Sequence, residues 1–141
     1  MKYLIILLLI VSFQLSACVS FQEKFDTDAF VESLKADEDP VIEAISVYVP
    51  ARINEYKADY SYIYLKDGDD LILGSSTSVM RAPIPKSISE KNDYKAIFFN
   101  IQEKYKNSIE LEVHYVKPNE PNVFGGCSKV KRYRLSELKS L

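Results

Sequence analysis

Apolar and polar residues alternate along much of this chain with a period of two residues, which is typical of β-strands. The clearest case runs from Tyr56 to Tyr64, where four tyrosines and an alanine share the even positions and polar residues hold the first odd positions. This pattern predicts a long strand with one buried face. The Asp-Gly pair within Lys66–Asp69 predicts a tight turn, after which Leu71–Leu73 returns to complete a β-hairpin.

Further strands are predicted on both sides of this hairpin. In Val41–Val49 the alternating β-branched residues favour a strand, although the aspartate and proline before it also permit a helical turn there. Tyr94–Gln102 and the alternating segment Ile109–Tyr115 are predicted to pair as a second hairpin. Lys129–Leu135 predicts a last strand at a sheet edge, where lysines discourage aggregation. Residues 74–93, rich in Ser and with two prolines, predict an irregular connection, within which a short strand at Thr77–Ala82 is an open alternative.

One segment near the N-terminus carries a helical pattern instead. In Thr27–Ala36 the apolar residues Phe30, Val31 and Leu34 form one stripe at helical spacing, and an acidic run followed by Pro40 ends it. One helix followed by five or six antiparallel strands is an α+β arrangement. The expected fold is therefore an N-terminal helix packed on a mostly antiparallel sheet of five to six strands.

The first 18 residues differ in character from the rest of the chain. Lys2 supplies a positive charge, and the apolar run Tyr3–Phe13 is too short for a membrane-spanning helix, which needs about 20 apolar residues. This combination is typical of a cleaved secretory signal peptide. The tetrapeptide Leu15-Ser16-Ala17-Cys18 that follows it resembles the lipobox of bacterial lipoproteins.

The resemblance implies how the N-terminus is processed. Cys18 would carry a diacylglycerol thioether, cleavage would fall between Ala17 and Cys18, and the new amino group would commonly be acylated too, which gives stable membrane anchoring. Residues 18–26 would form the lipidated N-terminus and a short tether, and residues 27–141 a single globular domain. Val19 is not the aspartate that favours inner-membrane retention in many enterobacteria. The expected location is the periplasmic face of the outer membrane in a Gram-negative cell, or outside the cytoplasmic membrane in a Gram-positive one.

The charge of the mature chain narrows the class of partner. Removing residues 1–17 takes Lys2 from the 18 lysines and arginines, which leaves 17 positive against 20 negative residues, a formal charge of −3. A mildly acidic chain argues against nucleic acid as a partner and has no general attraction to anionic lipid. With Cys18 lipidated, Cys127 has no intrachain partner, and a small buried residue is favoured over a thiol that pairs between chains.

Groups that could carry catalysis are few. The single histidine, His114, lies on the predicted polar face of a strand, and Cys127 follows two glycines in a loop. Together they would be the minimum for a thiol nucleophile, but nothing in the sequence brings them together. One His and one Cys are too few for a transition-metal site, and Asp67–Asp70 lacks the alternating ligands and terminal glutamate of a calcium loop. No catalytic residue, metal or cofactor is therefore predicted.

Two groups of side chains are candidates for recognition. A tyrosine ladder exposed on one strand face would offer rigid contact area with hydrogen-bonding tips, although the polar residues on the opposite face favour rings buried in the core. A dense positive cluster near the C-terminus is either a solvated edge strand or a site for lipid headgroups, a cell-wall polymer or an acidic protein. The ladder consists of Tyr56, Tyr60, Tyr62 and Tyr64, and the cluster of Lys129, Lys131, Arg132 and Arg134.

The sequence thus favours a membrane-anchored envelope lipoprotein that acts as a non-enzymatic binding or accessory module for another envelope protein or polymer. The alternative is a protective, immunity-type lipoprotein that neutralises a cell-wall hydrolase or a toxin. The loop that enters the attacker's site would then be Ala82–Lys86 or Lys117–Asn122. A thiol enzyme that uses Cys127 and His114 is a third hypothesis.

Overall fold

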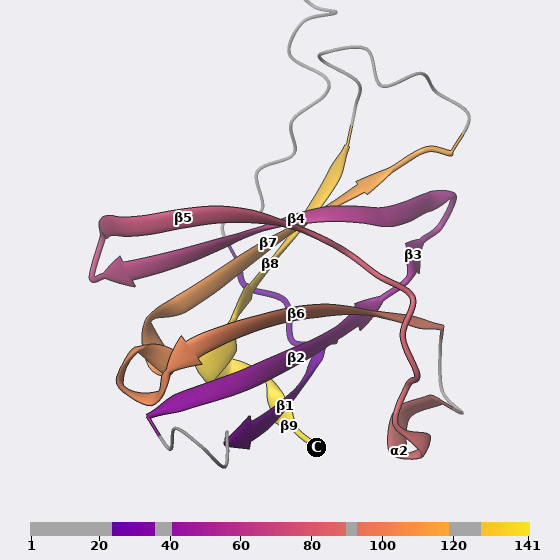
Figure 1. Ribbon diagram of the computed structural model, residues 1–141. Helices are drawn as coiled ribbons and strands as arrows, with labels where there is room; N and C mark the ends of the chain where they lie inside the picture. Colours follow the sequence, from indigo (N-terminus) through magenta and orange to yellow (C-terminus); the bar gives the residue numbers. More distant parts are fainter. Residues whose placement is uncertain (1–23, 36–40, 90–92, 119–127) are drawn as a thin grey trace, which may run out of the picture.

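The computed structural model describes residues 24–35, 41–89, 93–118 and 128–141, and over these residues the chain forms two β-sheets (Figure 1). Strands make up 63% and helical segments 13% of the described residues, and no helix among them reaches 7 residues. The predicted α+β fold, with an N-terminal helix packed on one sheet, is therefore wrong. Ala17, Cys18 and Cys127 lie outside the described residues.

The first sheet has four strands in the order β6-β2-β1-β9. Its central pair, β1 (Phe30–Lys35) and β2 (Ile42–Pro50), is antiparallel, and β6 (Tyr94–Gln102) runs antiparallel to β2 along its whole length. The short strand β9 (Lys139–Ser140) pairs with β1 in parallel and returns the end of the chain to this sheet.

The second sheet has the order β3-β4-β7-β8, and β5 also pairs with β4. The long strand β4 (Tyr56–Asp67) pairs with β3 (Arg52–Ile53) at its start and with β5 (Asp70–Ser78) farther along the same edge. Along its other edge lies β7 (Ile109–Val116), followed by β8 (Lys129–Arg134). All pairs in this sheet are antiparallel.

In the part of the chain that the structure describes, three short helical segments connect the strands. The α2 helix (Lys86–Ser89) precedes β6, and the 3₁₀ segment η1 (Glu103–Ser108) carries the chain from β6 in the first sheet to β7 in the second. A second 3₁₀ segment, η2 (Leu135–Glu137), returns it from β8 to β9. The chain therefore crosses between the two layers at both 3₁₀ segments.

The hydrophobic core fills the space between the two sheets (Figure 1). Because alternate side chains of a strand share a face, the two-residue period of the sequence becomes a buried layer in each sheet. β2 contributes Ile45, Val47 and Val49, and β7 contributes Leu111 and Val113, each at most 1% exposed.

The segment predicted to be helical is strand β1. Its alternate residue Val31 is 4% exposed opposite Val47, whereas Leu34, which a helical stripe would bury, is 60% exposed. Phe30 packs edge-on against Tyr94, with ring centroids 5.7 Å apart. Apolar residues at positions 30, 31 and 34 fit the period of a helix as well as that of a strand. Pairing with β2 and β9 supplies the backbone hydrogen bonds and packing that an isolated short helix lacks.

The strands predicted at 41–49, 56–64, 94–102, 109–115 and 129–135 are confirmed, with small differences at their ends. The hairpin of β4 and β5 and the edge position of β8 are also confirmed. The predicted hairpin of β6 and β7 is wrong, because β6 pairs with β2 while β7 pairs with β4 and β8. Proximity in sequence suggested that pair, but η1 moves the chain to the other sheet.

The segment between β5 and β6 covers part of the outer face of the first sheet. Ile88 of α2 is 2% exposed and packs with Tyr48 and Tyr94 in a second, smaller hydrophobic cluster. Ala82 and Ile84 pack against the same cluster. The candidate inhibitory loop Ala82–Lys86 is therefore anchored to the sheet at two positions, and most of the other candidate, Lys117–Asn122, lies outside the described residues.

Candidate functional site

A β-bulge in β4 decides where the tyrosine ladder points. Ala58 and Tyr60 lie opposite consecutive residues of β7, at positions 115 and 114, so Asp59 is an extra residue without an opposite partner. Before the bulge Ala58 faces the core at 1% exposure, and after it Ser61 takes the inward position at 0%. One extra residue exchanges the two faces of a strand for all the residues that follow.

Tyr60, Tyr62 and Tyr64 therefore lie on the outer face of the second sheet, and we call these three residues the tyrosine face. Tyr60 stacks on His114 with ring centroids 4.5 Å apart, and Tyr62 lies edge-on to Tyr60 at 5.7 Å and stacks on Tyr64 at 6.2 Å. Their cross-strand neighbours in β5 are small, namely Ser78, Ser76 and Gly74. Of the two interpretations of the ladder, the structure places these three rings outside the core.

Tyr56 lies before the bulge and is separated from the other three rings. It packs against the hydrophobic core. The ammonium groups of Lys129 and Lys117 lie 4.7 and 5.5 Å from the centroid of its ring. Because a cation is attracted to the face of an aromatic ring, Lys129 stabilises the rim of the core at this position.

The basic cluster at the C-terminus divides between the two faces of β8. Lys131 binds Asp28, while Arg132 and Arg134 lie on the outer face, each within 3.4 Å of a Glu110 oxygen. Burial alone would raise the pKa of Glu110, but the hydrogen bonds and charges of the neighbouring cations outweigh it and lower that pKa. The four predicted residues therefore do not form one positive surface, because carboxylates of the same chain neutralise most of their charge.

His114 lies beside the tyrosine face, in ring contact with Tyr60 and Tyr62. Its Nε2 lies 3.0 Å from Glu112 Oε1, and its Nδ1 lies 3.4 Å from the Ser128 hydroxyl oxygen. Burial raises the pKa of both Tyr60 and Tyr64, so their hydroxyl groups stay protonated at neutral pH. The surface is thus suited to ring contacts and hydrogen bonding, and its described residues do not include an activated nucleophile.

The outer end of the β4–β5 hairpin carries an exposed apolar run. Leu71, Ile72 and Leu73 are 59%, 57% and 62% exposed. Leu73 lies opposite Leu65 and Leu71 opposite Lys66, so Ile72 is an extra residue and the run spreads over both faces of the hairpin. Figure 1 shows this end at the left of the molecule, where no other labelled element covers it.

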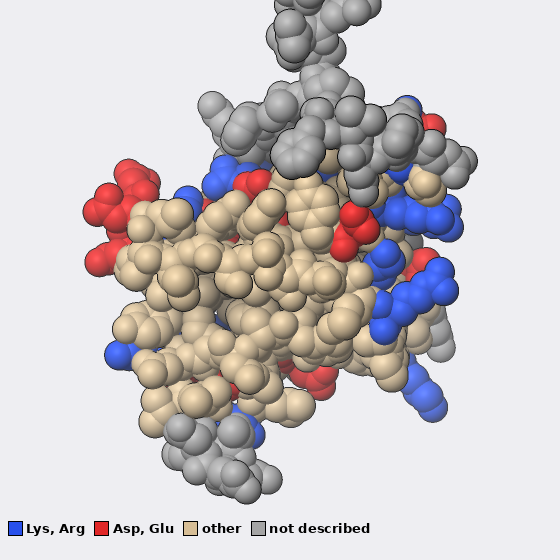
Figure 2. Space-filling view, turned by 45° about the horizontal axis from the view of Figure 1, so that its top comes forward, with Lys and Arg blue, Asp and Glu red and all other residues tan. Residues whose placement is uncertain are grey.

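Three carboxylates adjoin the apolar run at the turn of the hairpin. The strand pair closes at Asp67 and Asp70, and Gly68 adopts the positive φ of 61° that the tight turn requires. Both of these aspartates and Asp69 are exposed. Figure 2 shows acidic side chains gathered at this end, beside a broad surface without charged groups. A complementary partner would therefore present apolar side chains flanked by basic ones.

The two outer edges of the second sheet differ in how well they are protected. β8 carries lysines and arginines, which discourage the addition of another strand. β5 reads DLILGSSTS, without Lys, Arg or Pro, and within the described chain it pairs only with β4. The N–H of Val79 donates to the carbonyl of Asp59 on the β4 side. Because backbone groups alternate along a strand, those of Gly74, Ser76 and Ser78 point away from β4 and are open to an added strand.

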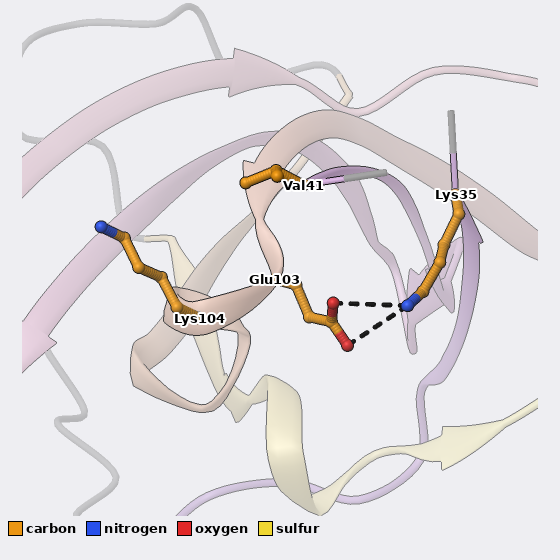
Figure 3. Close-up of a pocket in the computed structure, with 4 residues that line it drawn as sticks. All are labelled: Lys35, Val41, Glu103 and Lys104. Carbon is orange, nitrogen blue, oxygen red and sulfur yellow. Dashed lines mark hydrogen bonds and ion pairs between the residues drawn. The ribbon is translucent and has the colours of Figure 1, made fainter. Parts of the chain in front are cut away.

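A shallow pocket of about 510 Å³ opens where β1 ends and η1 begins (Figure 3). Lys35 Nζ lies 3.3 Å from Glu103 Oε2, with the two side chains 59% and 57% exposed, while Lys104 points away from this pair. Val41 completes the described lining. An exposed pair of this kind contributes at most about 1 kcal/mol, and its charges neutralise each other. These four residues include no imidazole or thiol for catalysis.

No three His, Cys, Asp or Glu side chains of the described segments come together as metal ligands. Within the same segments, no helix is long and apolar enough to cross a bilayer. The chain matches no protein-family model, no curated protein and no solved structure.

Proposed function

We propose that this protein is a lipid-anchored envelope protein that binds another protein through the free edge of β5 and the apolar run beside it, without catalytic activity of its own. One observation carries the proposal. Leu71, Ile72 and Leu73 are each more than half exposed next to a strand edge that lacks the usual protection against pairing. An exposed apolar edge of this kind promotes aggregation unless a partner covers it.

The partner best suited to this edge is a protein that contributes an extended strand. Backbone hydrogen bonds to Gly74–Ser78 would supply affinity, and apolar side chains against the Leu71–Leu73 run would supply specificity. Basic residues at one end of that strand would complement the acidic turn. The same acidic turn disfavours insertion of the hairpin into an anionic bilayer, because like charges repel there.

The proposed anchor leaves this edge accessible. If Cys18 carries the lipid, the seven residue steps from Cys18 to Phe25 span at most about 25 Å. Phe25 packs on Arg132 and Arg134, with its ring centroid 5.1 and 4.2 Å from their guanidinium carbons. The tether therefore reaches the second sheet at β8. The free edge of β5 lies at the opposite side of that sheet, three strand spacings or about 14 Å away.

The lipid anchor is tested by replacing the cysteine. Cys18→Ser is expected to abolish lipid labelling completely and to leave the precursor unprocessed, because the thiol forms the thioether and processing follows it. The measurement is metabolic labelling with a fatty-acid probe, together with the mobility of the protein on a gel. If the wild-type protein carried no lipid label and the Cys18→Ser variant were still cleaved normally, the N-terminus would be an ordinary signal peptide instead.

The binding edge is tested by crosslinking in living cells. A photoreactive amino acid at Ile72 is expected to give one major protein adduct, whereas the same probe at the exposed Ser136 in η2 should give none. Leu71→Asp with Leu73→Asp should reduce the adduct at least about tenfold, which corresponds to about 1.4 kcal/mol. Equal adducts from both probe positions would contradict the proposal.

Strand addition itself has a sharper control. Ser76→Pro removes an N–H group that points away from β4, so it should also reduce the adduct about tenfold. Ser76→Ala keeps that N–H and should leave the adduct unchanged. Proline without effect would leave contact with the apolar side chains as the binding mode and exclude strand pairing. A cell-wall hydrolase or a toxin in the adduct would favour the protective alternative.

A further inference from the structure

A cleft rich in cations lies at the opposite end of the molecule from the hairpin turn. It has a volume of about 430 Å³ and opens between the start of β4, the start of β6 and the segment that precedes α2. Figure 2 shows Lys and Arg side chains gathered at this end. Its described lining consists of Ala51, Arg52, Lys57, Arg81, Ala82, Ile84, Asp93, Tyr94 and Lys95.

Four cations in this lining face one carboxylate, although the whole chain has a net charge of −2. Arg52 and Lys57 are direct cross-strand partners in the β3–β4 pair. Like charges in that relation destabilise a sheet. Within the described segments, none of the four cations of the cleft forms an ion pair. The cations Lys131, Arg132 and Arg134 of β8, in contrast, all do.

Lys95 brings a positive charge to the gap between the two sheets. It lies opposite Val49, on the inner face of the first sheet, and its ammonium donates to the backbone carbonyl of Ala58 in the second. Burial lowers the pKa of Lys95, the carboxylate of Asp59 opposes that shift, and the charge of Arg81 adds to it. The ammonium of Lys95 is therefore partly removed from water between the two sheets, beside the charges of Arg81 and Lys57 and the opposing carboxylates of Asp59 and Asp93, and an anion in the cleft would stabilise its charged form.

We propose that this cleft binds a ligand that carries a phosphate monoester. Two guanidinium groups and two ammonium groups can together pair with the two charges and the acceptor oxygens of such a phosphate. Ile84 and Ala82 form an apolar wall for the organic part of the ligand. The volume lies within the range of about 300–1,000 Å³ that is usual for small-molecule sites and is larger than a bare phosphate ion needs. This inference does not depend on the proposed partner of β5.

The site is tested with matched ligands by NMR of the purified protein in non-ionic detergent. Glucose 6-phosphate is expected to give saturable shifts confined to amides around residues 51–57, 81–84 and 93–95, whereas glucose should give none. A second arm uses nanodiscs of phosphatidylcholine with or without phosphatidic acid, which distinguishes a soluble phosphate from a lipid headgroup. Saturable shifts at the cleft in either arm support the proposal, and their absence from both arms overturns it.

Paired variants separate the cleft from general electrostatics. Lys57→Gln with Arg81→Gln should weaken phosphate binding at least about tenfold, because half of the cations are lost. Lys104→Gln with Lys139→Gln changes the net charge equally outside the cleft and should alter binding less than about twofold. Equal weakening by both pairs would overturn the proposal.

A measurement of the melting temperature checks binding in the cleft independently of the NMR chemical shifts. Lys57→Gln should raise the melting temperature of the unligated protein, because it removes the like-charge contact with Arg52. Glucose 6-phosphate should raise the melting temperature of the wild type more than that of the Lys57→Gln and Arg81→Gln double variant. Equal stabilisation of both proteins by the ligand would contradict binding in the cleft.

Discussion

Deleting Ser61 is expected to lower the free energy of unfolding by more than about 3 kcal/mol, whereas deleting Asp59 should lower it by only about 1 kcal/mol. The two residues lie two positions apart on β4: Asp59 is the extra residue of the bulge, and Ser61 is the first inward residue after it. Without Asp59 the pairing with β7 becomes regular. The main loss is then the 3.2 Å hydrogen bond from the Val79 N–H to its carbonyl.

Deleting Ser61 leaves β4 one residue short on the far side of the bulge. The strand can restore its register with β7 only by losing the bulge, and Tyr60 then moves to the inward position that Ser61 fills at 0% exposure. A tyrosine ring does not fit in a space shaped for a hydroxymethyl group, so the core is overpacked. Urea unfolding followed by circular dichroism measures both variants. Equal losses would show that the bulge does not set the two faces of β4.

The same bulge explains why the tyrosine ladder was only partly predictable. Tyr56 and the three residues of the tyrosine face share one parity in the sequence, and strict alternation would place all four on one side. The bulge depends on how β4 pairs with β7 and β5, which are distant in sequence. Alternation therefore identified the strand correctly, and long-range pairing decided which of its faces is buried.

Sheet membership was the second feature that the sequence could not determine. The period of two located β2, β4 and β7 because it follows from local geometry. Whether β6 and β7 pair depends on the connection between them, and the 3₁₀ segment η1 places them in different sheets. For β1 the apolar spacing fitted the helical period as well as the period of a strand, and pairing with β2 and β9 stabilises the strand.

The candidate surfaces also differ in how far the sequence could predict them. The hairpin was predictable from its Asp-Gly turn, and the Leu71–Leu73 run gave a signal that something must cover it, since three consecutive apolar residues break the alternation. The cationic cleft gave no such signal. Its Arg52 and Lys95 are more than forty positions apart, and only the fold brings them to one opening. Conversely, the cluster at the C-terminus is dense in sequence, but strand alternation and local carboxylates divide and neutralise it.

Replacing Lys106 with Met is expected to destabilise the protein by about 2 kcal/mol at pH 7, because the Glu43 side chain is buried while Lys106 is itself 34% exposed. Glu43 is 3% exposed, and its carboxylate accepts a hydrogen bond from the Ser33 hydroxyl and one of 3.0 Å from Lys106 Nζ. The variant would leave a buried charge with only the hydroxyl as partner. Lys35→Met is the comparison variant: it breaks the exposed pair with Glu103 and removes only the last and smallest of the contributions that lower the pKa of Glu43, so it should change stability by less than about 1 kcal/mol.

The pH dependence of this effect separates charge from packing. The hydrogen bond from Ser33 and then that from Lys106 lower the pKa of Glu43 below its ordinary value of 4.5, against the effect of burial. This stabilisation is therefore fully present above pH 4.5 and is lost as the pH falls through the lowered pKa of the folded state. Without Lys106 the balance moves toward burial and the pKa rises, so the difference between variant and wild type should shrink in acid.

Unfolding by urea at pH 7 and in a series below pH 4.5 tests this expectation. Glu43→Gln in the Lys106→Met background should recover most of the lost stability at pH 7, because a neutral amide can still accept the Ser33 hydrogen bond and no longer buries a charge. A loss that stays constant with pH, and that Glu43→Gln does not recover, would mean that the Lys106 side chain acts by packing. The buried carboxylate would then be stabilised mainly by Ser33, in agreement with the order of the contributions to its pKa.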